Sequence, residues 1–220
     1  MAYRRTENVI RRLAARHDAI LGAAAQLAAE AGINAVQIAP VAERSGIAAG
    51  TVYRYFPSKT ELIAALVESV SEREIGAMRR AADAAPGPLS ALAASLTTFA
   101  AQALERRRLA FALIAEPVDA DTEKARQPYR AALAAEIAKR LSTAMTGGYV
   151  PDQDIEVAAP ALVGALAEGL VGPLAPETAD DARRRDAVQA LTLFALRAVG
   201  VADARARGLV VQARMPAKAS

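Results

Sequence analysis

Side chains that can contact nucleic acid are concentrated in one short stretch near the N-terminus. Thr51, Tyr53, Arg54 and Tyr55 lie within five residues of one another. A guanidinium and several hydroxyls at this spacing can hydrogen-bond to base edges and to phosphate oxygens. Arg54 is the best candidate for a guanine contact, with Thr51 and the backbone near Gly50 approaching base edges beside it. The pattern favours binding over catalysis.

Residues that support catalysis are scarce in this chain. It has no cysteine and a single histidine, His17. It also has no glycine-rich phosphate loop and no paired-carboxylate motif, so a nucleophile and its base cannot be assembled. We therefore expect that the protein is not an enzyme and that it binds no metal and no cofactor.

The stretch that holds these side chains is divided into three helices by its own residues. Ser45-Gly46 ends the first helix, because glycine readily takes the left-handed conformation found there. Residues 48–55 then form a short candidate recognition helix, which Pro57 ends. Ser58 and Glu61 have the spacing of a capping box and begin a long connecting helix. The sequence therefore predicts a helix-turn-helix.

A known family shares this stretch. Residues 46–62 read Gly-Ile-Ala-Ala-Gly-Thr-Val-Tyr-Arg-Tyr-Phe-Pro-Ser-Lys-Thr-Glu-Leu, which resembles the DNA-binding signature of the TetR family of transcriptional regulators. Upstream, Ile20-Leu21, Ala24 and Glu30-Ala31-Gly32 resemble the first helix of that family. The match covers about residues 16–62.

The resemblance implies roles for further residues of the motif. Tyr53, Tyr55 and Lys59 match positions that usually touch phosphates, which would set affinity and register. The alternative for either tyrosine is packing against the first helix. Both roles are compatible, because a packed ring can still present its hydroxyl.

The chain departs from the family pattern at two places. Ala48 and Ala49 stand where a serine or threonine cap and often a lysine are usual, and Val36 and Gln37 stand where hydroxyl residues commonly cap the preceding helix and bind phosphate. A lost cap typically costs about 1 kcal/mol. These departures predict weaker DNA binding or an unusual base preference.

Composition indicates an all-α protein. The chain has 220 residues, 53% of them hydrophobic, with alanine dominant and only 4% aromatic, which favours helices and is ample for a core. Eight lysines and arginines face four acids in residues 1–60, whereas the rest of the chain is nearly neutral. This asymmetry suits a phosphate-facing module, although ordinary solvated charges explain it equally well.

The predicted organisation is an N-terminal helix-turn-helix domain (1–57), a helical ligand-binding and dimerisation domain (58–202) and a mobile tail (203–220). The first residues, 1–6, are expected to form a mobile arm whose Arg4 and Arg5 either reach DNA or stay in solvent. The apolar stretch 157–171 is too short to span a bilayer. We expect a cytoplasmic protein without membrane contact.

The C-terminal half is expected to hold an effector and a partner subunit. The resemblance implies a homodimer formed by the last two long helices, about residues 152–171 and 181–201, bound to a palindromic double-stranded DNA operator and released by a small apolar molecule. The alternative for these two helices is that they complete the core of one chain. Polar candidates to line an effector cavity are Thr97, Gln102, Glu116, Tyr129, Arg130 and Glu168.

A second class of function stays open at this point. The chain can instead be an apolar-ligand carrier or an interaction scaffold with a vestigial helix-turn-helix, which Ala48 and Ala49 would fit. Salt-dependent binding to promoter DNA would argue against it.

Overall fold

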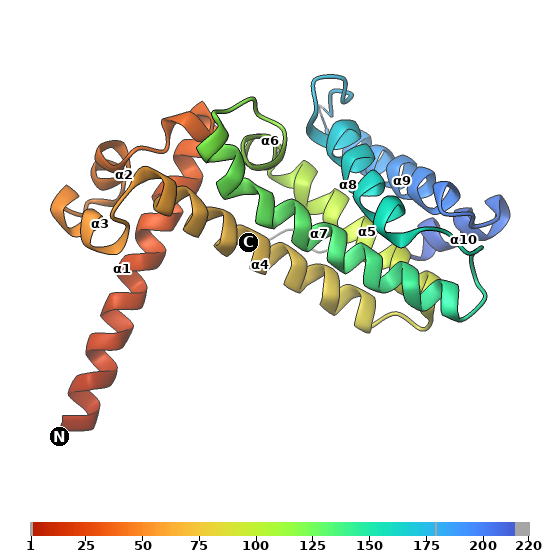
Figure 1. Ribbon diagram of the computed structural model, residues 1–220, viewed down its shortest axis with the longest axis horizontal. Coiled ribbons are helices and arrows are strands. Elements are labelled where there is room, and N and C mark those ends of the chain that lie inside the picture. Colours follow the sequence, from red (N-terminus) through yellow and green to blue (C-terminus); the bar gives the residue numbers. More distant parts are fainter. Residues whose placement is uncertain (1, 179, 214–220) are drawn as a thin grey trace.

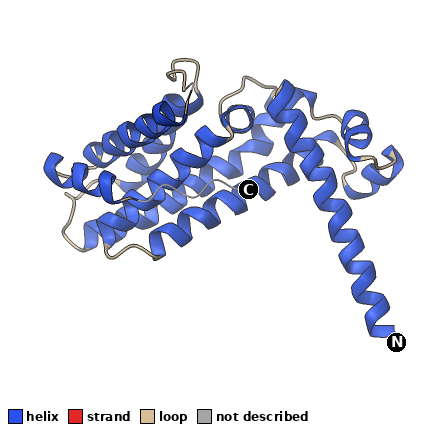
Figure 2. Cartoon of the chain, turned by 180° about the vertical axis from the view of Figure 1, so that it is seen from behind, coloured by secondary structure: helices blue, strands red, loops and turns tan. Residues whose placement is uncertain are grey.

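The computed structural model describes residues 2–178 and 180–213, and this part of the chain is helical throughout, without strands (Figures 1 and 2). The expected all-α fold is confirmed. Ten α-helices and one 3₁₀ helix occur in the described part: α1 (Ala2–Ala31), η1 (Ile33–Ala35), α2 (Ile38–Ser45), α3 (Ala49–Tyr55), α4 (Lys59–Asp83), α5 (Pro88–Glu105), α6 (Arg107–Ile114), α7 (Ala120–Thr146), α8 (Ile155–Val171), α9 (Asp181–Ala198) and α10 (Asp203–Gln212).

The N-terminal domain is a small core made by α1, α2 and α3. Ile20 and Ala24 of α1, Val41 of α2 and Val52 of α3 are fully buried. Gly46 separates α2 from α3 with φ 66° and ψ 22°, the left-handed conformation expected from the sequence. The helix-turn-helix is therefore fixed by one apolar anchor from each helix and one permissive turn.

Helix α4 connects this domain to the rest of the molecule. Its first turn is capped as the sequence predicts, since the Ser58 hydroxyl oxygen accepts a hydrogen bond from the Glu61 amide at 3.1 Å. Leu62, Ile63 and Leu66 are buried near its start, and Ile75 and Met78 near its end. The same helix packs on α1 and on α5 and α7, so it links the two halves mechanically.

The C-terminal half is a helical bundle whose core lies between α4, α5 and α7. Leu96 and Phe99 of α5 and Leu133 and Ile137 of α7 are fully buried there. Helix α8 packs on α7, and α9 packs on α5. Helix α7 begins at Ala120, where the Asp119 carboxylate caps it. The helix continues through Pro128, which therefore lies inside it.

The expected mobile tail is wrong for residues 203–212. They form α10, which packs on α9 and α5 and buries Ala206, Leu209 and Val210. The apolar pattern of this helix is weak in the sequence, because the helix is short and one of its buried residues is only an alanine. Residues 214–220 lie outside the described part of the chain.

The expected mobile arm also needs correction. The backbone is helical from Ala2, so α1 has 30 residues, a length of about 45 Å at 1.5 Å per residue. Its N-terminal half projects beyond the body of the molecule (Figure 1). Val9, Ile10 and Leu13 of this half are between 44% and 60% exposed. Met1 and the side chains of Arg4 and Arg5 lie outside the described structure.

No helix in the described ranges combines the length and the apolar character needed to cross a membrane. The division of the chain at residues 57 and 58 stays a prediction.

Candidate nucleic-acid interface

Helix α3 presents one face to the core and the opposite face to solvent. Val52 is completely buried and the following Phe56 nearly so. Gly50, Tyr53 and Arg54 are exposed. Since helix positions three or four apart share a face, the buried valine fixes which side chains of this helix point outward.

Thr51 and Arg54 open onto a groove between α3 and α1. Its lining is Leu13, Arg16, Thr51, Arg54 and Tyr55, and its volume is about 220 Å³. Within the described residues, the guanidiniums of Arg16 and Arg54 make no hydrogen bond and no salt bridge. Two unpaired guanidiniums from different helices therefore border one exposed surface, which suits phosphate and base contacts.

The two tyrosines have different environments. Tyr55 is half-buried, its hydroxyl donates to the Leu13 carbonyl at 3.4 Å, and the neighbouring His17 and Phe56 rings are 5.3 Å apart. Tyr53 is 53% exposed. Tyr55 thus packs on the first helix, the alternative expected for either tyrosine, while Tyr53 is available to a phosphate.

The start of α3 lacks a side-chain cap. Ala48 is the N-cap residue, with φ −56° and ψ 135°, and it makes no capping hydrogen bond. Ala48 and Ala49 are both exposed. The position therefore has a backbone suited to a capping hydroxyl but no group to supply one.

The N-terminus of α2 also lacks a side-chain cap. Gln37 is the exposed N-cap residue, and its Nε2 donates to the Asn34 carbonyl at 3.1 Å instead. Val36 is fully buried, so its apolar character serves the core. Lys59 is half-buried in the first turn of α4. Two hydrogen bonds from Thr122 lower the pKa of the Asp119 carboxyl from its ordinary value, and the positive charge of Lys59 lowers it further.

Arg44 is not available to DNA in this structure. Its guanidinium makes a two-point pair with the Glu30 carboxylate, at 2.8 and 2.7 Å. The same hydrogen bonds lower the pKa of Glu30 from its ordinary value. The pair joins α2 to α1 and steadies the helix-turn-helix.

Arg16 is the site residue that sequence reasoning missed. It is one of the basic residues of the N-terminal third, but no pattern in the neighbouring sequence places it beside Thr51 and Arg54. Only the packing of α1 across α3 brings them together.

The structure scatters the six candidate effector residues. Thr97 is buried and hydrogen-bonds Thr192 at 3.3 Å. The Tyr129 hydroxyl donates to the buried Glu74 carboxylate. Gln102 has a buried Oε1 without a partner in the described structure. These three side chains belong to the interior of the bundle.

The other three candidates serve helix ends. Glu116 accepts a hydrogen bond from the Ile33 amide at 2.8 Å. Arg130 donates to the Ile114 carbonyl at 2.7 Å, and Glu168 accepts from the Leu174 amide at 3.2 Å. Arg130 and Glu168 share a cleft of about 580 Å³ between α6, α7 and α8.

Comparison with known proteins agrees with this geometry. The family described as bacterial regulatory proteins, tetR family, matches residues 20–66. The chain is 47% identical over 58 residues to the HTH-type transcriptional repressor KstR of Rhodococcus jostii and 42% identical over 77 residues to KstR of Mycolicibacterium smegmatis. These matches cover 26% and 35% of this chain but only 27% and 38% of the relatives.

Solved structures resemble the chain over most of its length. RolR in complex with resorcinol has a TM-score of 0.67 at 24% identity, covering 94% of this chain and 98% of that one. FadR of Bacillus subtilis in complex with stearoyl-CoA has a TM-score of 0.67 at 18% identity, covering 79% and 96%. At such identities the likeness is one of fold.

The fold and the exposed face of α3 define a helix-turn-helix protein with an appended helical bundle. Residues 20–66 match the family described as bacterial regulatory proteins, tetR family, and the rest of the chain resembles the solved structures in fold.

Proposed function

We propose that the protein is a dimeric transcriptional repressor that binds a palindromic DNA operator through α3 and is released by a small molecule. The observation that carries this proposal is the exposed surface of Thr51, Tyr53 and Arg54, with Arg16 beside it. One short helix holds DNA weakly, but two helices related by a dyad can enter successive major grooves about 34 Å apart.

The effector part of the proposal is supported by relatives and by shape. The neighbouring structures named above hold resorcinol and stearoyl-CoA, and the bundle has open clefts of several hundred Å³, the size range of small-molecule sites. A ligand shifts the molecule away from DNA only if it binds the released arrangement more tightly.

The operator can be defined first, by selecting DNA from a random duplex pool with the purified protein. Arg54→Ala is then expected to lower the affinity for the selected duplex at least about tenfold, because a good base contact contributes about 1–3 kcal/mol. Tyr53→Ala should also weaken binding, and both variants should remain dimeric by light scattering.

Arg80→Ala provides the matched control, since it removes an exposed arginine of α4 far along the chain from α3. Wild-type affinity in Arg54→Ala and Tyr53→Ala would refute the assigned interface. Absence of salt-dependent DNA binding in the wild type would instead favour a ligand carrier or scaffold.

A further inference from the structure

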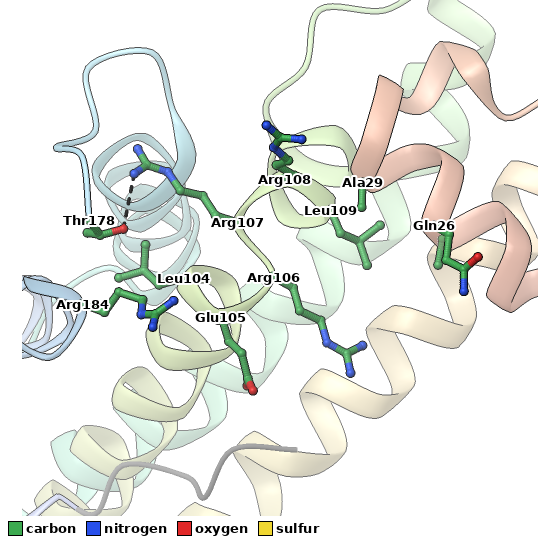
Figure 3. A pocket seen from close by; sticks show the side chains of 11 residues that line it. Gln26, Ala29, Leu104, Glu105, Arg106, Arg107, Arg108, Leu109, Thr178 and Arg184 are labelled. Atoms are coloured by element: carbon green, nitrogen blue, oxygen red, sulfur yellow. Dashed lines mark hydrogen bonds between the residues drawn. The ribbon is translucent and has the colours of Figure 1, made fainter. Parts of the chain in front are cut away.

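A cleft of about 540 Å³ lies where the two halves of the molecule meet. It is bordered by Ala25, Gln26 and Ala29 of α1, by residues 104–109 at the junction of α5 and α6, by Thr178 in the connection before α9, and by Arg184 in the first turn of α9. Figure 3 shows the side chains of this cleft. It therefore touches the DNA-binding domain and the bundle at once.

The rim of the cleft is strongly basic. Arg106, Arg107, Arg108 and Arg184 line it, with Glu105 as the one acidic residue of the described lining. In Figure 3 Arg107 and Arg184 lie on the side of Leu104, and Arg106 and Arg108 lie on the side of Leu109. Such an excess of cations around a concave surface attracts anions.

Two of the arginines are already engaged and two are not. Arg107 donates to the carbonyls of Ala175 and Pro176, at 3.2 and 2.9 Å, and thereby holds the connection between α8 and α9. Arg184 pairs with Asp181. Arg106 and Arg108 are exposed, and their guanidiniums make no hydrogen bond or salt bridge with any described residue.

The charge around Arg106 is poorly compensated. The Arg73 guanidinium of α4 lies near that of Arg106. Burial lowers the pKa of Arg73, and the positive charge of Arg106 lowers it further. Glu74 is an acid near both guanidiniums, with its Oε1 4.0 Å from Arg73 Nη2, but it is buried and its other carboxylate oxygen is bonded to Tyr129. A bound anion would relieve the repulsion between the two guanidiniums.

Apolar side chains form the inner wall of the cleft. Leu104 and Leu109 are buried, and Ala25 and Ala29 of α1 line the same cleft. A ligand that also has an apolar body can cover this wall and remove its apolar surface from water, which adds to the binding energy. A ligand with only a charged group lacks this contribution.

We propose that this cleft binds a small amphipathic anion, whose apolar body lies against Leu104, Leu109 and Ala29 and whose charged group pairs with Arg106 or Arg108. A carboxylate and a phosphate ester both meet this description, because a guanidinium binds either. That such a ligand also releases DNA rests on the proposed function: a molecule between α1 and the α5–α6 junction favours whichever arrangement of the two halves fits it better.

The binding part can be tested without DNA. The probe is 1-anilinonaphthalene-8-sulfonate, titrated by fluorescence, and N-phenyl-1-naphthylamine is its neutral counterpart without the sulfonate. Combining Arg106→Gln with Arg108→Gln should weaken binding of the sulfonate about tenfold or more, since a charge-assisted hydrogen bond is lost. Binding of the neutral probe should not change, and the single variants show which arginine carries the contact.

Arg80→Gln is the matched control, because it removes an exposed arginine that does not line the cleft. Unchanged sulfonate binding in the double variant, or an equal loss for the neutral probe, would overturn the proposal. Competition by decanoate and by decyl phosphate separates the two anion classes. Displacement by decanol as strong as by either acid would also overturn it.

The regulatory part has its own readout. Saturating sulfonate probe should lower the affinity of the wild-type protein for its selected duplex and leave that of the double variant unchanged. Equal DNA affinity with and without the probe would overturn the regulatory role while anion binding stands. A protein that binds the probe but no DNA would refute the proposed function instead.

Discussion

Ala48 illustrates how a single residue leaves a helix end incomplete. Its backbone already accepts hydrogen bonds from the Thr51 and Val52 amides, but its methyl group cannot accept one from the first turn of α3. The extended conformation at this position is the one that serine, threonine and aspartate take when they cap.

Ala48→Ser should therefore raise the free energy of unfolding by about 1 kcal/mol, since the new hydroxyl can accept from the first-turn amides. Urea unfolding measures the change, with an unaltered slope expected. Ala49→Ser lies one position too late to cap and is the control. The expectation fails if both serines have the same effect.

Glu74 is a buried acid within the bundle. It is only 4% exposed, and the Tyr129 hydroxyl donates to its carboxylate. Burial raises the pKa of Glu74 above its ordinary value of 4.5, while the Tyr129 hydrogen bond and the Arg73 charge act in the opposite direction. Folding therefore makes protonation of Glu74 easier than it is in the unfolded chain.

An acid whose pKa is raised by folding contributes stability that is fully present below pH 4.5 and is lost as pH rises through the folded pKa. Glu74→Gln keeps an acceptor for Tyr129 and cannot ionise. Its free energy of unfolding relative to wild type should therefore increase as pH rises above 4.5. Urea unfolding between about pH 4 and 8 tests this.

Glu72→Gln, which removes an exposed carboxylate from the same helix, is the control for that series. A difference between Glu74→Gln and wild type that stays constant over the whole pH range would show that burial does not favour the neutral acid.

At the scale of elements, Glu116 ties the end of α6 to the DNA-binding domain. Its Oε2 accepts from the Ile33 amide at 2.8 Å, just after α1 ends. Gly32 permits this approach: its φ is 83°, and a Cβ there would lie 2.6 Å from the Glu116 Oε1. Helices α1 and α6 also pack directly, so a movement of α6 reaches the helix-turn-helix through a defined contact.

Glu116→Ala should lower the free energy of unfolding by about 1–3 kcal/mol, because the Ile33 amide loses its acceptor. It should also speed hydrogen exchange at that amide. Glu116→Gln retains an acceptor and should lose less, which makes it the control. Equal losses in the two variants would mean that the hydrogen bond contributes nothing.

For the whole molecule, the exposed surface of α8 and α9 is the candidate dimer interface. Val157 is 63% exposed on α8 and Phe194 is 52% exposed on α9. Ala161 and Gly164 of α8 are also exposed. Small residues beside apolar ones let two helix pairs approach closely and form a four-helix bundle about a dyad.

Gly164→Arg tests this interface with little risk to the fold, since nothing lies within 4 Å of a Cβ built at Gly164. We expect the variant to be monomeric by light scattering and to lose most of its operator affinity, because a single α3 cannot span both half-sites. Gly22→Arg, at an equally open position of α1, should remain dimeric. A dimeric Gly164→Arg would move the interface elsewhere.

Much of the DNA-binding domain followed from local chemistry. Gly46 turns the chain and Ser58 caps α4 because each acts on backbone groups within a few residues. The predicted mobile tail was wrong for α10, whose apolar pattern is weak. Its residues are buried because they pack against α9 and α5, which the composition of α10 alone does not reveal.

The sequence by itself determined the helical class and the helix-turn-helix, since caps, turns and periodicity depend on near neighbours. Only the tertiary structure decided that Arg16 lies beside Arg54, that the effector candidates are dispersed, and that Arg106 borders a cleft with Ala29 and Arg184. These residues are far apart along the chain. Helix packing, which no local pattern encodes, brings them together.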